Sequence, residues 1–153
     1  MGKRLTELSP QLIDFIEKQK LFFVGTAANE GRVNVSPKGM DTFRVLDQNK
    51  IVWLNLTGSG NETAAHLLKN NRMTIMFCSF EKKPMILRLY GDAQIFHHRD
   101  EKFHDYIDLF SDLSGKRQII EMNIDLVQTS CGYAVPFMEF KEERKTLKTW
   151  ADK

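Results

Sequence analysis

The sequence has little cysteine, little proline and no long hydrophobic run. Of its 153 residues, two are Cys and four are Pro. Cys78 and Cys131 lie far apart and neither belongs to a CxxC pair, which favours two unrelated free thiols over a disulfide. The apolar stretch 21–28 is far shorter than the roughly 20 residues of a membrane span. Because the N-terminus also lacks an apolar signal core, we expect a cytoplasmic protein with no membrane partner.

An excess of charge of one sign is also missing. The 22 Lys and Arg residues face 20 Asp and Glu residues, which gives a formal net charge of only +2. The basic residues are scattered, and their densest group, 141–148, is interleaved with Glu142 and Glu143. Binding of nucleic acid needs a concentrated basic face, so the sequence gives no reason to expect a nucleic-acid partner.

Phenylalanine, by contrast, is abundant. The chain has 11 Phe against two Trp and three Tyr. This is more aromatic surface than a small monomer leaves exposed, so it predicts a core, an interface or a pocket for a flat ligand. The length fits one domain, over residues 1–153, with a sizeable core.

Apolar patterning predicts short strands joined by turns, with a few helices inserted between them. Strands are expected over 21–27, 32–36, 42–46, 51–56, 73–80, 85–96, 117–129 and 138–140, and helices over 10–20, from 61, over 100–110 and over 142–150. Pro37 is expected to stop or bend its strand, and Gly91 to mark a bulge. Short turns favour antiparallel pairing, so the fold class is mainly β, a barrel or sandwich with helices at its rim.

The segment 51–66 is the first candidate site. A predicted strand runs into the glycine-rich stretch Gly58-Ser59-Gly60, and a predicted helix follows at once. Glycines let backbone N–H groups converge, and Ser59, Asn61 and Thr63 add side-chain donors, so the segment predicts an anion cradle suited to phosphate. It lacks the Lys of a Walker loop and the third Gly of a dinucleotide fingerprint, and a capped helix after a loose turn is the alternative.

A second segment, 33–39, could supply the missing cation. Ser36 and Lys38 present a hydroxyl and an ammonium group beside Pro37 at the expected strand end. If this end lies beside the glycine-rich loop, Lys38 provides the positive charge that the loop lacks. The alternative is a surface lysine in a turn.

Together these segments resemble the pyridoxamine 5′-phosphate oxidase-related, FMN-binding split-barrel family, particularly its short-chain branch. The resemblance rests on the order and spacing of five stretches: 21–27, 35–39, 58–63, 89–93 and 130–136. It implies a six-stranded antiparallel split β-barrel with rim helices, which dimerises and holds two FMN molecules at the subunit interface. It also implies an FMN-dependent oxidoreductase acting on an unknown small molecule. A non-catalytic flavin-binding protein, or a haem or deazaflavin F420 binder on the same barrel, is the alternative.

The resemblance also implies positions for the cofactor. It places Val35, Ser36, Pro37 and Lys38 around the flavin and its phosphate, and Trp53, Leu54 and Asn55 along the ring or ribityl chain. It places Gly58, Ser59, Gly60, Asn61 and Thr63 at the phosphate, and it brings the segment around Ser130 to the flavin from the partner subunit. Two departures stand out. Glu62 is acidic where many relatives carry Lys or Arg, and residues 148–153 have no counterpart of the Arg-containing segment with which true pyridoxamine phosphate oxidases bind substrate. No catalytic acid or base is evident.

Two weaker candidates complete the inventory. His97, His98 and His104 suggest a metal only superficially, since no carboxylate or Cys completes a ligand pattern. Cys131 has no His in a recognisable relation to it, so a packed cysteine is expected rather than a nucleophile.

Overall fold

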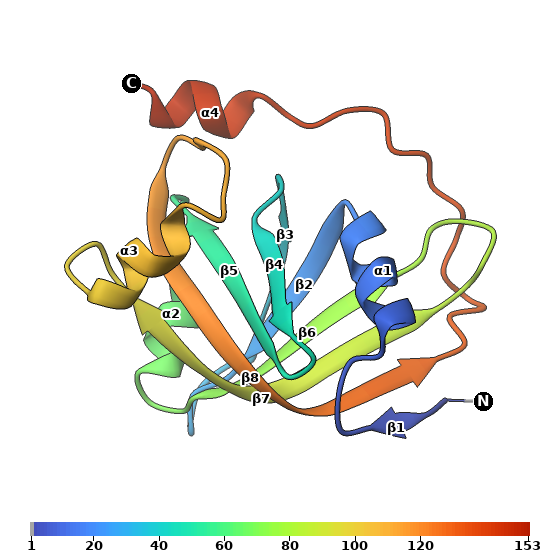
Figure 1. Cartoon of the computed structure of the whole chain (residues 1–153). Coiled ribbons are helices and arrows are strands. Elements are labelled where there is room, and N and C mark those ends of the chain that lie inside the picture. Colours follow the sequence, from blue (N-terminus) through green and yellow to red (C-terminus); the bar gives the residue numbers. More distant parts are fainter. Residues whose placement is uncertain (1) are drawn as a thin grey trace.

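One curled antiparallel sheet forms the body of the protein (Figure 1), as a computed structural model that describes residues 2–153 shows. The strands are β1 (Arg4–Leu5), β2 (Leu21–Thr26), β3 (Asn34–Gly39), β4 (Phe43–Asp47), β5 (Lys50–Leu56), β6 (Arg72–Cys78), β7 (Ile86–Phe96) and β8 (Lys116–Ser130). Their order is β3-β2-β6-β7-β8-β5-β4, and β1 pairs with β8 near the C-terminal end of that strand. The mainly β, split-barrel prediction is confirmed.

The barrel stays open along one seam. Strands β3 and β4 follow each other in the chain, joined by residues 40–42, yet they are the two edges of the sheet and do not pair with each other. Each edge strand is hydrogen-bonded to one neighbour only, β3 to β2 and β4 to β5. The curl therefore brings two unpaired edges to the same side of the molecule (Figure 1).

Aromatic side chains fill the barrel interior. Phe22 contacts Phe43, Trp53 and Phe77, with ring centroids 4.9, 5.9 and 5.8 Å apart, and the tilted and edge-to-face packing suits their quadrupoles. Helix α1 (Pro10–Lys18) begins with a proline at its first turn, where no N–H is needed. Its buried residues close the core from one side, as helical spacing predicts.

A second, smaller core lies on the other side of β5 and β8. Helix α3 (Glu101–Ile107) covers it with Phe103, and Phe110 follows. The helix is fixed by a polar contact as well: the Tyr106 hydroxyl donates a short hydrogen bond to the buried Glu121 carboxylate, which Lys102 also contacts at 3.2 Å. These donors lower the pKa of Glu121 against the opposing effect of its burial, and the hydrogen bond to Glu121 raises the pKa of Tyr106 to about 12.

Several sequence predictions need correction. The sheet has eight strands rather than six, because Arg4–Leu5 adds a two-residue strand and seven strands form the barrel wall. Strand β3 does not stop at Pro37: it runs on to Gly39 with Pro37 opposite Phe23, since an edge strand tolerates a missing N–H. Residues 138–140 form no strand, because they lie in an exposed segment without a sheet neighbour. The bulge at Gly91 is confirmed by a register shift there.

Two short helices complete the fold. Helix α2 (Glu62–Leu67) follows the glycine-rich loop, and α4 (Thr146–Ala151) ends a long C-terminal segment that crosses the open end of the barrel (Figure 1). No helix within residues 2–153 is long and apolar enough to cross a membrane.

The Tyr106–Glu121 contact generates a test of the second core. We expect Tyr106→Phe to lower the free energy of unfolding by about 1–3 kcal/mol at neutral pH, because a buried carboxylate loses a donor. The loss should shrink as pH falls through the lowered pKa of Glu121, since the contact stabilises the fold only while Glu121 is ionised. Urea unfolding of wild type and variant between pH 3 and 8 measures both effects. The control is Glu101→Gln, which replaces an exposed carboxylate on the same helix. A loss of unfolding free energy in Tyr106→Phe that is the same at every pH would contradict the prediction.

Candidate functional site

The inner face of β3 carries a row of polar side chains. Along this strand Asn34, Ser36 and Lys38 are half-buried, whereas Val35 and Pro37 between them are exposed, as the two-residue period of a strand requires. Ser36 Oγ donates to Asn34 Oδ1 at 3.1 Å, and Asn34 Nδ2 donates to Thr63 Oγ1 of α2 at 3.3 Å. The first residue of β3 is therefore linked side chain to side chain with the helix that follows the glycine-rich loop.

Arg117, on β8, holds the glycine-rich loop in place. Its guanidinium donates to the carbonyl oxygens of Gly58 and Gly60, at 2.7 and 3.0 Å, and to Thr57 Oγ1 at 3.1 Å. At the loop's start, the Thr57 N–H donates to the carbonyl of Gly115 at 2.7 Å. Beneath the loop, Asn55 Nδ2 donates to Gln118 Oε1 at 2.9 Å, which orients a buried polar pair toward α2.

Lys38 lies beside this loop and next to a buried aromatic ring. Its Nζ is 5.2 Å from the centroid of Trp53, a cation–π distance. Burial and then the nearby charge of Arg117 lower the pKa of Lys38, against an opposing effect of Glu62. Within residues 2–153 no carboxylate oxygen lies within 4.0 Å of the Lys38 ammonium or the Arg117 guanidinium. Two cations thus share one site without an ion-pair partner.

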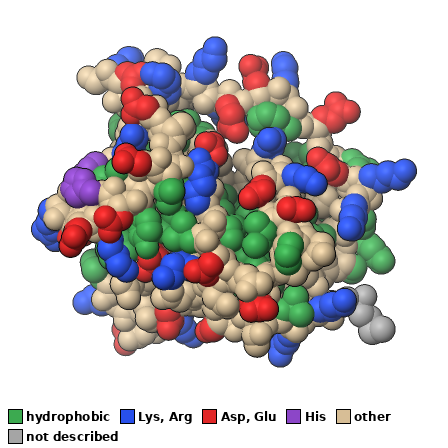
Figure 2. Space-filling model, in the orientation of Figure 1, with side chains coloured by type: hydrophobic (Ala, Val, Ile, Leu, Met, Phe, Trp, Pro, Cys, Tyr) green, Lys and Arg blue, Asp and Glu red, His purple; other side chains and the backbone are tan. Residues whose placement is uncertain are grey.

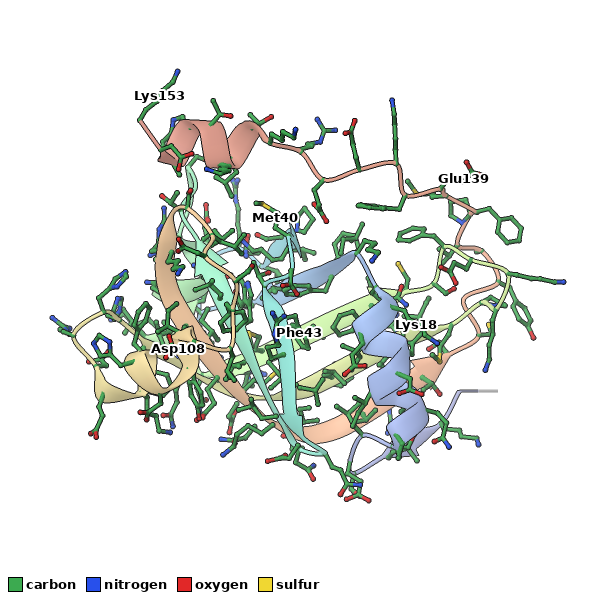
Figure 3. The ribbon with its side chains drawn as sticks, turned by 45° about the horizontal axis from the view of Figure 1, so that its top comes forward. Lys18, Met40, Phe43, Asp108, Glu139 and Lys153 are labelled. Carbon is green, nitrogen blue, oxygen red and sulfur yellow. The ribbon has the colours of Figure 1, made fainter. Side chains whose placement is uncertain are left out.

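A cavity of about 830 Å³ opens at this point. Its walls include Pro37, Lys38, Met40, Gly58 and Ser59 from the barrel, and Phe140, Leu147 and Trp150 from the C-terminal segment. Figure 2 shows the surface hollowed beneath that segment, and Figure 3 shows Met40 on the barrel side of the hollow. Lys38 and the glycine-rich residues Gly58 and Ser59 thus line one cavity, which is the arrangement that would let Lys38 supply the loop with a positive charge.

The turn at the open seam is held in an unusual conformation. Met40 and Asp41 both have left-handed backbone angles, with φ of 66° and 50°, which are uncommon for residues other than glycine. Arg44 fixes the turn with two hydrogen bonds to the Asp41 carboxylate, at 2.7 and 3.0 Å, and one to the carbonyl of Leu109. The surrounding contacts thus hold a strained turn at the cavity's edge, a pattern common at binding sites.

The predicted site residues fall into three groups. The first group makes the contacts described above: Pro37, Lys38, Gly58 and Ser59 line one cavity with Trp53 beside Lys38, Asn34 links Ser36 to Thr63, Asn55 Nδ2 lies 3.5 Å from Asn61 Oδ1, and Gly60 is held by Arg117. The side chains of Val35 and Leu54 point elsewhere: Val35 is exposed on the outer face of β3, and Leu54 is buried with Phe103 and Phe110. Ser130 lies at the opposite end of β8 from Arg117 and accepts a hydrogen bond from Arg88.

Three polar residues of this site escaped the sequence analysis. Asn34 could have been found, because it precedes Ser36 and Lys38 at the two-residue period of one strand face. Arg117 and Gln118 gave no local signal, since they come from a strand more than 50 residues further along the chain. Their place depends on the pairing of β5 with β8, which sets Asn55 opposite Gln118.

The weaker candidates do not form a site. Within residues 2–153 no three His, Cys, Asp or Glu side chains gather as metal ligands would. His98 stacks on Phe103 and bonds the carbonyl of Lys116, and His66 bonds the Thr26 hydroxyl. Cys78 is buried and burial raises its pKa. The expectation of a packed Cys131 is wrong, because that residue is an exposed free thiol that follows the last strand.

Solved structures share this fold at low sequence identity. HupZ of Group A Streptococcus matches with a TM-score of 0.62 at 18% identity, over 78% of this chain and 91% of that one. A FAD binding protein of Mycobacterium smegmatis matches at 0.58 and 15%, over 82% and 97%. The heme storage protein HutZ of Vibrio cholerae matches at 0.53 and 20%, over 78% and 92%. At these identities the likeness establishes the fold alone.

Sequence comparison goes further. The chain is 40% identical over 144 residues to the pyridoxamine 5′-phosphate oxidase family protein ustO of Aspergillus flavus, covering 91% of this chain and 58% of that protein. It therefore spans somewhat more than half of that relative's length. The family model described as pyridoxamine 5′-phosphate oxidase matches residues 8–131, which include β3, the glycine-rich loop and Arg117. The chain belongs to the pyridoxamine 5′-phosphate oxidase family.

Proposed function

We propose that residues 1–153 form one FMN-binding domain of a cytoplasmic, homodimeric, flavin-dependent oxidoreductase that acts on a small molecule. The observation that carries this proposal is that Lys38 and the glycine-rich loop line one cavity, while Arg117 holds that loop from β8. A phosphate monoester needs a cation, several hydrogen-bond donors and freedom from nearby side-chain bulk, and this site offers all three.

The electrostatics of the site fit an anion. Lys38 and Arg117 lie close enough to disfavour each other's charge, so a dianionic phosphate between them would relieve that repulsion. Glu62 indicates where the anion would lie: its carboxylate occupies the space that a side chain at Gly60 would fill, and its charge favours protonated Lys38. The Glu62 carboxylate thus acts as a stand-in anion in the free protein.

The remaining predicted contacts concern the rest of the cofactor. Pro37 lines the cavity beside Lys38, and Trp53 lies beneath the Lys38 ammonium, so both flank the space that the ribityl chain would enter from the phosphate. Leu54 and Val35 would offer backbone atoms rather than side chains to a flavin in the same chain. FMN, when bound, supplies two-electron chemistry at its ring, and the residues of this chain bind and orient it.

A homodimer would complete the site. Val33 and Val35 lie at and beside the unpaired edge of β3 with exposed fractions of 71% and 65%, which is unusual for apolar side chains in a monomer. A second copy covering this edge would bury them and would bring its own Ser130 segment toward the flavin. We therefore propose that FMN lies at the interface of two copies.

The choice of flavin over haem is supported by the side chains present. None of the four histidines of the chain lines the cavity beside Lys38, so the cavity offers no imidazole as an axial ligand. Two neighbours in fold, described as a FAD binding protein and as the heme storage protein HutZ, nevertheless make both cofactors worth testing.

The first experiment is the absorption spectrum of the purified protein, followed by titration with FMN, FAD and hemin. Uptake of FMN with a flavin spectrum supports the proposal. Colourless protein that binds no FMN overturns it, and a haem spectrum with no flavin uptake replaces FMN by haem. Anaerobic reduction by NADH or NADPH then separates the enzyme from a non-catalytic flavin binder. Reduction faster than that of free FMN indicates turnover, and no acceleration with either donor indicates the binder.

Lys38 provides a matched test of the phosphate site. We expect Lys38→Met to weaken FMN binding by about 1–3 kcal/mol, the scale of a charge-assisted hydrogen bond, and to leave riboflavin binding unchanged. The same variant should raise the melting temperature of the free protein, because it removes a partly buried cation beside Arg117. Flavin fluorescence titration and thermal unfolding measure the two effects. The control is Lys69→Met, which replaces an exposed lysine beyond α2 and should change neither FMN affinity nor melting temperature. If Lys38→Met weakened riboflavin binding as much as FMN binding, Lys38 would not lie at the phosphate.

Replacing Glu62 tests the same phosphate site by a change that should strengthen FMN binding. We expect Glu62→Gln to strengthen FMN binding by up to about fivefold, or 1 kcal/mol, because the phosphate no longer displaces a carboxylate. The gain should disappear for riboflavin, which has no phosphate. Glu81→Gln, an exposed glutamate in the β6–β7 loop, is the control. Weaker FMN binding by Glu62→Gln would show that the carboxylate helps the site rather than competing in it.

A further inference from the structure

We propose that the C-terminal segment from Phe140 to Trp150 is the roof of the flavin site, with Trp150 and Leu147 contacting the isoalloxazine ring; this inference rests on the proposed function. The first observation is position. Lys38, Gly58 and Ser59, which face the proposed phosphate, share one cavity with Phe140, Leu147 and Trp150. A flavin anchored by its phosphate on the first wall therefore lies against the second.

The second observation is that α4 is only loosely packed against the rest of the protein. None of its residues is buried, and Trp150 is 59% exposed. A six-residue helix is unstable by itself, so its place must come from contacts at its ends and from what fills the space beneath it. Its two large apolar side chains, Leu147 and Trp150, both face the cavity.

The third observation is that both ends of the roof are attached to the site. Lys20 Nζ lies 5.6 Å from the ring centroid of Phe140 at one end. At the other end the Ser114 hydroxyl donates to the Asp152 carboxylate, and Gly115 is packed so closely that an added Cβ would come 2.6 Å from Thr57 Cγ2 and 3.2 Å from Ala151 Cβ. Thr57 begins the glycine-rich loop, so the roof and the phosphate loop meet at Gly115.

Charge gives the orientation of the ligand. Glu142, Glu143 and Arg144 also line the cavity on the roof side, so the two carboxylates outnumber the one cation there and disfavour a phosphate. Lys38 and the loop amides lie on the barrel side. The phosphate therefore belongs on the barrel wall, and the uncharged ring belongs beneath Leu147 and Trp150. The cavity volume of about 830 Å³ is ample for both.

The roof lies beyond the residues that define the family match. That match ends at residue 131, before the whole segment. Because its side chains line the same cavity as Lys38, the roof is positioned to affect which flavin this chain accepts.

The first test is the affinity of Trp150 variants for two flavins. We expect Trp150→Ala to weaken both FMN and riboflavin about three- to tenfold, the scale of a lost aromatic contact, and Trp150→Phe to restore most of the affinity. Phe137→Ala removes an aromatic side chain that is 79% exposed and does not line the cavity, so it should change neither affinity. Because Trp150 is largely exposed, the variants should fold, which circular dichroism verifies.

The second test is protease protection of the roof itself. Trypsin sites occur in it at Lys141, Arg144, Lys145 and Lys148. At FMN ten times above its Kd, cleavage at these sites should slow by up to about tenfold, while cleavage at Lys69 stays constant. Trp150→Ala should reduce the protection.

The outcomes separate the two proposals. If the wild type binds FMN but Trp150→Ala binds both flavins equally well and FMN leaves roof cleavage unchanged, the roof inference is wrong and the proposed function stands. If the wild type binds no FMN, the proposed function fails and the roof inference fails with it.

Discussion

The open seam between β3 and β4 is the constraint on which the site depends. Had the two edge strands paired, the inner face of β3 would face a closed core, and Lys38 would be an unpaired buried charge of high cost. Because the seam stays open, Lys38 can lie over Trp53 with its ammonium near the surface. The same opening requires a turn at Met40 and Asp41 that no regular hairpin supplies, and Arg44 holds it. The curl of the sheet and the position of Lys38 thus both depend on the unpaired edges of β3 and β4.

A feature of the fold or the site could be predicted from the sequence where its signal lies in neighbouring residues, and not where it depends on how distant strands pair. Two-residue alternation and turn signals are local, so most strands and the bulge at Gly91 could be predicted, whereas the placement of Lys38 beside the loop stayed conditional because it depends on how the sheet curls. Pro37 misled the strand prediction because its effect depends on whether the strand is an edge, which is a property of the whole sheet. Arg117 and Gln118 were inaccessible for the same reason: only the register of β5 against β8 places them beneath the loop.

The site carries a conflict between stability and function. Lys38 and Arg117 disfavour each other, and burial adds to the effect on Lys38. A chain selected for stability alone would replace Lys38 by an apolar residue, since the Trp53 ring below it would accept one. Retaining the ammonium makes sense if an anion offsets its cost for part of the time, and Glu62 offsets part of it when no ligand is bound. Such groups, destabilising alone and stabilised by a ligand, are common in binding sites.

The phenylalanines divide into those that the fold of one chain buries and those that it leaves exposed. Phe22, Phe43 and Phe77 fill the barrel and Phe103 and Phe110 fill the second core, so much of the excess is ordinary packing. Phe137 and Phe140 are different: they remain 79% and 54% exposed on a segment that no strand pairs with. An aromatic side chain left in water on an extended segment adds little apolar burial to the fold of one chain. Phe140 lines the cavity, where the proposed flavin would cover it, whereas Phe137 lies outside the cavity and would be covered only by a second copy.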